Sequence, residues 1–196
     1  MKGQPKAEQR TETIRRFIKA GREIFARQGY AQAATEEIVQ QVGLTRGALY
    51  HHFSSKEGLF RAVLSEVQQK VAWQVEEASS QGADPWEQLQ LGCRAFLASS
   101  LDKEVQQIML TDAPAVLGWE AWREMDAENS FRLLKEVLDV LVARGLIETH
   151  STQALAHLLS GAMNEAALWI VRSPAPQLAL TEASRTLEEL LEALRK

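Results

Sequence analysis

The chain has 196 residues, of which 45% are hydrophobic and 24% are charged, a composition typical of an ordinary soluble globular protein. The longest apolar run, residues 166–171, is far shorter than the ~20 residues that span a bilayer, and the charged N-terminus lacks the apolar core of a secretion signal. The single cysteine excludes an internal disulfide and agrees with a reducing compartment. We therefore expect a cytoplasmic protein without a membrane segment.

The net charge of −4 is distributed unevenly. Residues 1–60 carry ten Lys or Arg against six Asp or Glu, whereas the remaining 136 residues carry twelve against twenty. A basic N-terminal part on an acidic body is the distribution expected when only the first part faces phosphates. Solvated helices also vary in charge without any function, so the asymmetry alone does not decide between these two interpretations.

The first helix is expected from about Thr11 to Gln28. Its apolar residues repeat at helical spacing, and Gly29 stands where a helix ends. Residues 1–10 are polar and lack periodicity, so we expect a mobile arm there. The three basic residues of this arm could contact phosphates, or the arm could have no function.

A second and a third helix follow, separated by a tight turn. Thr35 is expected to cap the second helix, and Gly43 can adopt the left-handed conformation that ends it. Thr45 is expected to cap the third helix, on which Leu49 and Phe53 repeat the four-residue apolar spacing.

The remaining positions of the third helix carry small residues and hydrogen-bond donors. They are Arg46, Gly47, Ala48, Tyr50, His51 and His52, and no carboxylate interrupts them in the sequence. A helix that enters the DNA major groove needs small residues for close approach, donors for phosphates and base edges, and no negative charge. This pattern predicts a helix-turn-helix whose second helix recognises DNA.

An ordered run of residues in this region resembles the DNA-binding domain of the TetR family of bacterial transcriptional regulators. The run is Val42-Gly43-Leu44-Thr45-Arg46-Gly47-Ala48-Leu49-Tyr50-His51-His52-Phe53, followed by Lys56 and Leu59. The resemblance covers roughly residues 14–64. It implies a three-helix DNA-binding domain at residues 1–56 and a larger effector-binding and dimerisation domain at residues 57–196.

Arg46 is the residue most expected to contact bases directly, with Gly47 and Ala48 allowing the close approach. The other polar residues of the region are expected mostly to hold phosphates. The complete predicted DNA-binding set is Thr35, Thr45, Arg46, Gly47, Ala48, Tyr50, His51, His52 and Lys56.

A long helix from about Lys56 to Ser79 follows the helix-turn-helix. Ser54 and Glu57 match a capping box at its start. Lys56 lies in the first turn, where the backbone N–H groups and the helix dipole favour an anion such as a DNA phosphate. Because this helix joins the two predicted domains, it is expected to carry any signal between them.

Further amphipathic helices fill the rest of the chain. Asp84 and Pro85 are a capping residue and a first-turn proline, and Gly145 marks a helix end. The expected helices run from Asp84 to about Ser100, Lys103 to Leu110, Trp119 to Arg144, about 152–172 and about 177–194, with a break at residues 111–114. The chain therefore predicts an all-α protein of about nine helices.

Bulky aromatic and methionine side chains are frequent in the second domain. Such side chains can line an apolar ligand pocket in which a few polar groups fix the orientation of the ligand, but each also suits an ordinary core. The TetR resemblance implies an effector pocket in this region. The predicted lining is Phe96, Met109, Trp119, Trp122, Met125, His157, Met163 and Asn164, and the effector is an unidentified small molecule.

The last two expected helices each present an apolar stripe, and the first of them is rich in small residues. Small residues allow helices to approach closely, so two copies of the pair could form a four-helix dimer interface, or the stripes could pack within one monomer. The resemblance favours a homodimer formed through residues 152–172 and 177–194.

Enzymatic and metal chemistry find little support in the sequence. His51 and His52 are adjacent on a helix and diverge, and the other two histidines lack nearby Cys or carboxylate partners at metal-ligand spacing. No phosphate-cradling glycine loop is present. We therefore expect no catalysis and no cofactor. The expected function is a ligand-responsive repressor of a palindromic DNA operator, and the alternative is a helical protein-interaction module without sequence-specific DNA binding.

Overall fold

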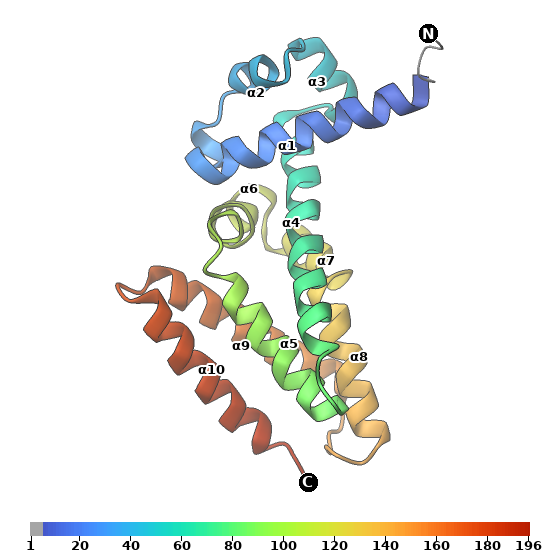
Figure 1. Cartoon of the computed structure of the whole chain (residues 1–196), viewed down its shortest axis with the longest axis vertical. Coiled ribbons are helices and arrows are strands. Elements are labelled where there is room, and N and C mark those ends of the chain that lie inside the picture. Colours follow the sequence, from blue (N-terminus) through green and yellow to red (C-terminus); the bar gives the residue numbers. More distant parts are fainter. Residues whose placement is uncertain (1–5) are drawn as a thin grey trace.

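The computed structural model describes residues 6–196, and this part of the chain confirms the all-α prediction (Figure 1). It forms ten α-helices and one π-helix, where about nine helices were expected. The helices are α1 (Lys6–Gln32), α2 (Thr35–Val42), α3 (Arg46–Phe53), α4 (Lys56–Ser79), α5 (Pro85–Ser99), the π-helix η1 (Val105–Asp112), α6 (Ala113–Leu117), α7 (Trp119–Ala127), α8 (Ser130–Ala143), α9 (Thr152–Arg172) and α10 (Pro176–Glu192).

Helices α1 to α3 and the start of α4 form a small head above the body (Figure 1). Phe17, Ile24, Ile38 and Leu49, from three different helices, are completely buried in its core. Burial of such side chains contributes about 1.5–3 kcal/mol each, so the three helices need one another to be stable.

Helix α1 begins five residues earlier than expected. Residues 6–10 were assigned to the mobile arm, but they are helical, because they are good helix formers and Thr11 and Thr13 hydrogen-bond back to the carbonyls of Ala7 and Gln9. The rest of the expected arm, residues 1–5, lies outside the described residues. Gly29 breaks the helical geometry as predicted, with φ 76° and ψ 164°, and a last turn follows it.

Two of the predicted helix caps are wrong. Ala34, not Thr35, occupies the cap position of α2 and makes no side-chain hydrogen bond there. At α4 the cap is Ser55, whose Oγ accepts the N–H of Gly58 at 2.9 Å. Ser54 cannot cap α4 because α3 continues through Phe53 and Ser54 ends that helix with a positive φ of 63°.

Two other caps are confirmed. The Oγ1 of Thr45 accepts the N–H of Ala48 at 3.2 Å, and Oδ1 of Asp84 accepts the N–H groups of Trp86 and Glu87 at 2.8 and 2.9 Å. Each satisfies backbone donors that have no partner inside the helix.

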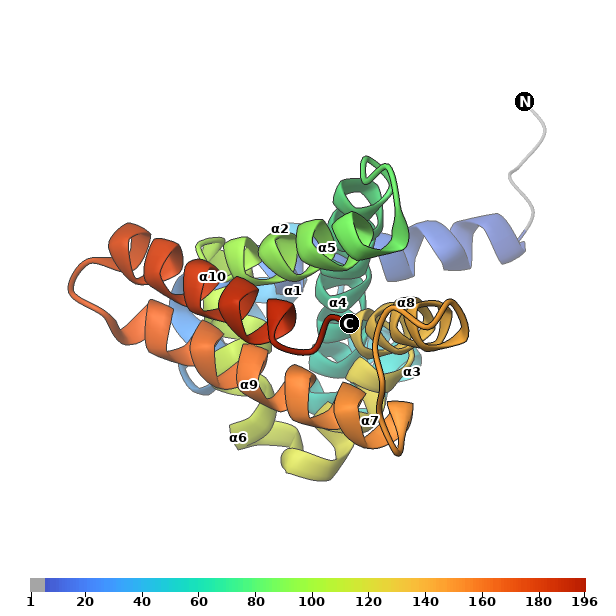
Figure 2. The same cartoon turned by 90° about the horizontal axis from the view of Figure 1, so that it is seen from below.

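Helix α4 has the predicted bounds and runs from the head to the far end of the body (Figure 1). Its buried stripe packs against α1 and α3 at one end and against α5, α7, α8 and η1 further down. In the view from below, α9 and α10 lie side by side, and α5 packs on both (Figure 2). The head and the body therefore share one helix.

The single helix expected from Trp119 to Arg144 is two helices, α7 and α8. Asn129 interrupts the helical geometry, with φ −118° and ψ −115°, and its side-chain amide donates to the carbonyl of Met125 at 2.7 Å. A side chain that hydrogen-bonds to a nearby backbone carbonyl competes with the backbone hydrogen bonds of the helix. Gly145, with φ 69°, follows the end of α8 as predicted.

The helix expected from Lys103 to Leu110 is the π-helix η1, which starts at Val105. No break follows it at residues 111–114, because Pro114 lies in the first turn of α6, where a helix tolerates proline. The Oγ1 of Thr111 donates to the carbonyl of Gln106, five residues back, at 2.7 Å. Single π-turns of this kind are frequent at functional sites.

Among the described residues, α9 is long and apolar enough to cross a bilayer by length and composition, with a mean hydropathy of 1.2 over 18 residues. The longest uninterrupted apolar run in the sequence did not reveal this property of α9, because small and polar residues interrupt the apolar residues of the helix. Core helices meet the same criterion, and α9 packs against α5, α8 and α10.

Candidate nucleic-acid interface and body cavity

Helices α2 and α3 form the predicted helix-turn-helix. Gly43 takes the left-handed conformation, with φ 70° and ψ 33°, and its N–H bonds to the carbonyls of α2. A residue with a Cβ would be strained there. Leu49 points into the head core, which fixes the rotation of α3 and turns the opposite face outward.

The outward face of α3 exposes Arg46, Gly47, Tyr50 and His51, as predicted, and Ala48 is half-buried at its edge. An Nη2 of Arg46 donates to the Tyr50 hydroxyl at 3.2 Å, and the guanidinium lies 5.6 Å from the Tyr50 ring centroid. The hydrogen bond from Arg46 lowers the pKa of Tyr50. The two side chains are therefore arranged as one unit on the surface.

Helix α3 itself carries no carboxylate, but the neighbouring helix brings one to its outward face. Glu36, in the first turn of α2, lies beside α3, and its Oε1 is 2.7 Å from Nη1 of Arg46. The neighbour comes from the packing of α2 against α3, which the sequence of α3 does not show. Both side chains are more than half exposed, so the pair is weak and can separate.

Three of the predicted DNA-binding residues are buried or half-buried. Thr35 is buried, with 8% of its surface exposed. His52 lies half-buried with its ring 6.4 Å from that of Phe17, and burial lowers its pKa. Lys56 is half-buried, and its Nζ donates to the carbonyl of Tyr30 at 2.5 Å and lies 4.3 Å from the centroid of that ring. Its phosphate contact stays a prediction.

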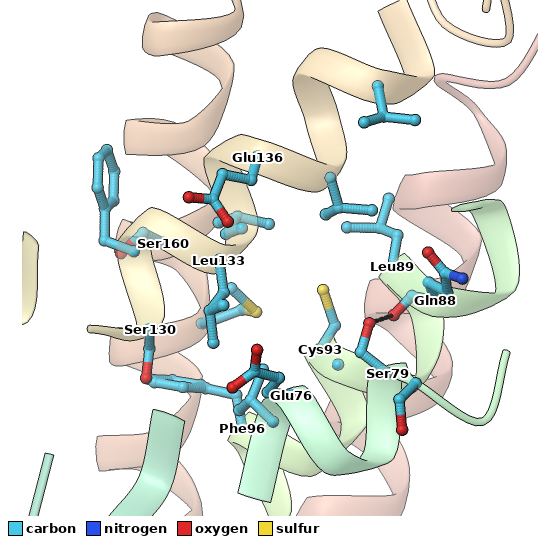
Figure 3. A pocket seen from close by; sticks show the side chains of 18 of the residues that line it. Glu76, Ser79, Gln88, Leu89, Cys93, Phe96, Ser130, Leu133, Glu136 and Ser160 are labelled. Carbon is cyan, nitrogen blue, oxygen red and sulfur yellow. Dashed lines mark hydrogen bonds between the residues drawn. The ribbon is translucent and has the colours of Figure 1, made fainter. Parts of the chain in front are cut away.

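The body contains a cavity of about 340 Å³ near the lower end of α4. Residues of α4, α5, α7, α8 and α9 line it (Figure 3). The apolar part of the lining consists of Val75, Leu89, Cys93, Phe96, Phe131, Leu133, Leu134, Val137, Val140 and Met163. The polar part consists of Glu76, Ser79, Ser80, Gln88, Asp126, Ser130, Glu136 and Ser160. A mostly apolar hollow with few polar groups is the usual form of a small-molecule site.

Within residues 6–196, no group of three or more His, Cys, Asp or Glu side chains is arranged to hold a metal ion.

Two sequence models of known families match the chain. The one described as bacterial regulatory proteins, tetR family, matches residues 17–63, which include α2 and α3. The one described as tetracyclin repressor-like, C-terminal domain, matches residues 86–194, more than half of the chain. The chain belongs to the TetR family. TetR-family proteins are ligand-responsive DNA-binding regulators of transcription.

Individual TetR-family proteins resemble the chain along most of its length. A TetR-family transcriptional regulator from Pectobacterium atrosepticum is 34% identical, superposes with a TM-score of 0.83 and covers 98% of both chains. The regulator SrpR from Pseudomonas putida is 28% identical over 136 residues, which are 68% of this chain and 63% of SrpR. FadR from Bacillus subtilis, solved with stearoyl-CoA, is 20% identical with a TM-score of 0.71 over 90% of this chain and 96% of FadR, and it shares the fold.

The predicted effector residues are dispersed over the body. Phe96 and Met163 line the cavity, and the other six do not. Trp122 and Met109 are completely buried in the core, Trp119 is 63% exposed, and Met125 is half-buried. The ring centroid of His157 lies 4.7 Å from that of the cavity residue Phe131, and Asn164 donates to the carbonyl of Ser160 at 3.0 Å. The effector role of all eight stays a prediction.

Sequence reasoning missed the polar residues of the cavity, above all Asp126. This carboxylate is only 2% exposed, and burial raises its pKa while Arg123 opposes the rise. One signal was available: Asp126 follows the buried Trp122 by four residues on the same helix and so faces the core. A carboxylate on a buried helix face needs a partner or a function.

Proposed function

We propose that the chain is a homodimeric repressor that binds a palindromic operator through α3 and is released by a small molecule bound in the body cavity. The observation that carries this proposal is the course of α4. Its first turn follows the DNA-binding helix directly, and Val75, Glu76 and Ser79 in its last turns line the cavity. A ligand that moves the lower end of α4 moves the head as well.

Polar contacts between the head and η1 support this coupling. The N–H of Tyr30 donates to Oδ2 of Asp112 at 2.7 Å, and Nε of Arg22 donates to Oε1 of Glu104 at 3.0 Å. The head is thus tied to α4 and to the π-helix at once. The ligand can shift the equilibrium between DNA-bound and released arrangements only by its difference in affinity for the two.

An exposed apolar stripe on the last two helices supports the dimer. Leu158 and Trp169 on α9 are 72% and 47% exposed, and Leu178 and Leu190 on α10 are 59% and 55% exposed. Between them, Gly161 and Ala162 are exposed and would allow close helix approach. Exposed apolar patches of this kind mark interaction surfaces, and a two-fold pair would present two α3 helices to one DNA duplex.

Selection of bound fragments from random double-stranded DNA, scored at several salt concentrations, tests the proposal. We expect a palindromic site whose affinity falls with salt as several phosphate contacts require. The alternative, a helical protein-interaction module, leaves the exposed Arg46 and Tyr50 without a role and predicts no enriched sequence. Protein that has been unfolded and refolded to remove any co-purified effector serves as the control. If it too enriches no sequence at low salt, the proposal fails.

A further inference from the structure

Three side chains of the cavity lining carry carboxyl groups. Glu76, Asp126 and Glu136 line the space from α4, α7 and α8, and no Lys, Arg or His belongs to the lining among the described residues. In Figure 3 the carboxylates of Glu76 and Glu136 lie below and above the central space, and the thiol of Cys93 lies between them. The cavity therefore disfavours anionic guests.

Arginines outside the lining offset part of this charge. Oδ2 of Asp126 is 3.1 Å from Nη1 of Arg123, and Oε1 of Glu136 is 2.8 Å from Nη1 of Arg132. Glu76 has no ion pair with any residue in the part of the chain that the structure describes. The remaining charge at the cavity is negative, and Glu76, a lining residue that is exposed to solvent, carries it.

Asp126 supplies a second observation, independent of the charge. Its Oδ1 is shielded from water and has no hydrogen-bond partner, although the residue is 98% buried and belongs to the lining. Arg123 does not donate to this oxygen: its Nη1 donates to the other oxygen, Oδ2, and both terminal nitrogens donate to Oγ of Ser160 at 3.2 Å. A buried acceptor without a donor is destabilising, and an N–H group placed in the cavity would satisfy it.

The remaining residues of the lining indicate what the rest of the ligand is made of. Phe96, Phe131, Leu134 and Met163 offer aromatic and flexible apolar surface. Cys93 adds to it, because burial raises the pKa of its thiol to about 12 and keeps it uncharged. A volume of about 340 Å³ is at the lower end of the range for sites of drug-sized ligands, roughly 300–1,000 Å³.

We propose that the cavity binds a lipophilic organic amine or amidine, whose protonated nitrogen donates to Oδ1 of Asp126 and lies in the field of Glu76, and whose apolar body fills the space between α5 and α8. This names the ligand class of the site in the proposed function and rests on that function only for the role of the ligand as effector. Binding itself can be measured without DNA.

Calorimetric titration of the full chain with four probes that share one biphenyl body tests the inference. The probes are 4-biphenylmethylammonium, its N,N,N-trimethyl analogue, 4-biphenylmethanol and biphenyl-4-carboxylate. We expect the primary ammonium to bind about 10- to 100-fold more tightly than the alcohol, as a charged hydrogen bond implies, and the carboxylate to bind most weakly. The trimethyl analogue keeps the charge without a donor and should fall between the ammonium and the alcohol.

Single variants test the role of each carboxylate separately. Glu76→Gln and Asp126→Asn should each reduce the preference for the ammonium over the alcohol. Glu77→Gln, at a residue that is exposed like Glu76 but does not line the cavity, should not. If Asp126→Asn does not fold, judged by circular dichroism, the comparison of Glu76→Gln with Glu77→Gln decides. Equal binding of alcohol and ammonium to the wild type, or equal behaviour of Glu76→Gln and Glu77→Gln, would overturn the inference.

Release of the operator is a separate measurement. Binding of the ammonium without DNA release supports the ligand class and counts against the cavity as the effector site. DNA release by an uncharged or anionic compound, with no ammonium binding, overturns the ligand class and leaves the proposed function intact.

Discussion

Arg46 is held between two neighbouring side chains before any DNA is present. Tyr50 accepts its hydrogen bond from the same helix, and Glu36 pairs with it from α2. Both partners contact the guanidinium on the outer surface of α3, where we propose that it reaches a base edge. A contact between Arg46 and a base would replace the ion pair with Glu36. The pair therefore opposes DNA binding in general, and it favours sites where the new contact compensates for its loss.

Replacement of Arg46 by alanine should cost about 1–3 kcal/mol of operator binding and relax the choice of base at one position of each half-site. The measurement is fluorescence anisotropy on the selected operator and on single-base variants of it. An equal loss on operator and random DNA would assign Arg46 to a phosphate instead.

Glu36→Gln should have the opposite effect on random DNA. Loss of the negative charge beside Arg46 removes repulsion from the phosphates, so binding to random sequences should tighten and the ratio of operator to random affinity should fall. Glu77→Gln makes the same charge change at the far end of α4 and serves as the control. The account of Glu36 fails if both variants bind random DNA alike.

The buried thiol of Cys93 makes stability depend on alkaline pH. Its pKa is raised to about 12 in the folded chain from 9.0, so the unfolded chain loses the proton first. The contribution of the buried neutral thiol to the free energy of unfolding is fully present below pH 9 and disappears as the pH rises from about 9 through about 12. At pH 10 wild type should have lost about 1.4 kcal/mol of unfolding free energy that Cys93→Ala does not lose, measured by urea unfolding of both proteins at pH 8 and 10. A constant difference between the two would contradict the assignment.

At the scale of the element, the connection between α3 and α4 has almost no free space. A Cβ added to Gly58 would lie 2.0 Å from the carbonyl oxygen of Phe53, so the backbone would have to shift to accommodate it. The tight connection sets the position of α3 on α4, which the transmission of a signal requires.

Gly58→Ala should therefore destabilise the chain by more than about 2 kcal/mol, despite the better helix propensity of alanine. Gly47→Ala, at an exposed site of α3 where an added Cβ would meet only Oγ1 of Thr45 at 3.7 Å, is the matched control and should be neutral or slightly stabilising. Thermal unfolding of the two variants measures the difference. Equal melting temperatures would show that the connection can relax.

Local signals in the sequence located most elements. The Asp84 cap, the turn at Gly43 and the end of α8 at Gly145 each depend on one or two residues, so the sequence predicts them. The sequence does not predict the break at Asn129, because the apolar periodicity of α7 continues into α8 across it. The exposed face of α3 was predictable for the same local reason, whereas the cavity gathers residues from five helices whose arrangement the sequence does not specify.

At the scale of the whole molecule, two copies are needed for the proposed function. One head offers one α3 helix, and a palindromic operator requires two at a spacing of about 34–36 Å or a multiple of it. The exposed apolar stripe of α9 and α10, which lies in the body below the head (Figure 1), is the surface that would set this spacing.

Leu158→Lys should convert the dimer to monomers and weaken operator binding by about tenfold or more, because a charge within the stripe must be buried without a partner. Trp73→Lys places the same charge on an exposed apolar residue of α4 and should leave the dimer intact. Sedimentation velocity measures the mass of both variants. A dimer that survives Leu158→Lys would move the interface elsewhere.

Hydroxyl-radical footprinting of the chain on the selected DNA site tests the central claim most directly. The account predicts two protected segments related by a two-fold axis, on one face of the duplex, with centres about 34–36 Å apart or a multiple of that distance. Protection of a single segment, or uniform weak protection along the fragment, would contradict a dimer that reads two half-sites through α3.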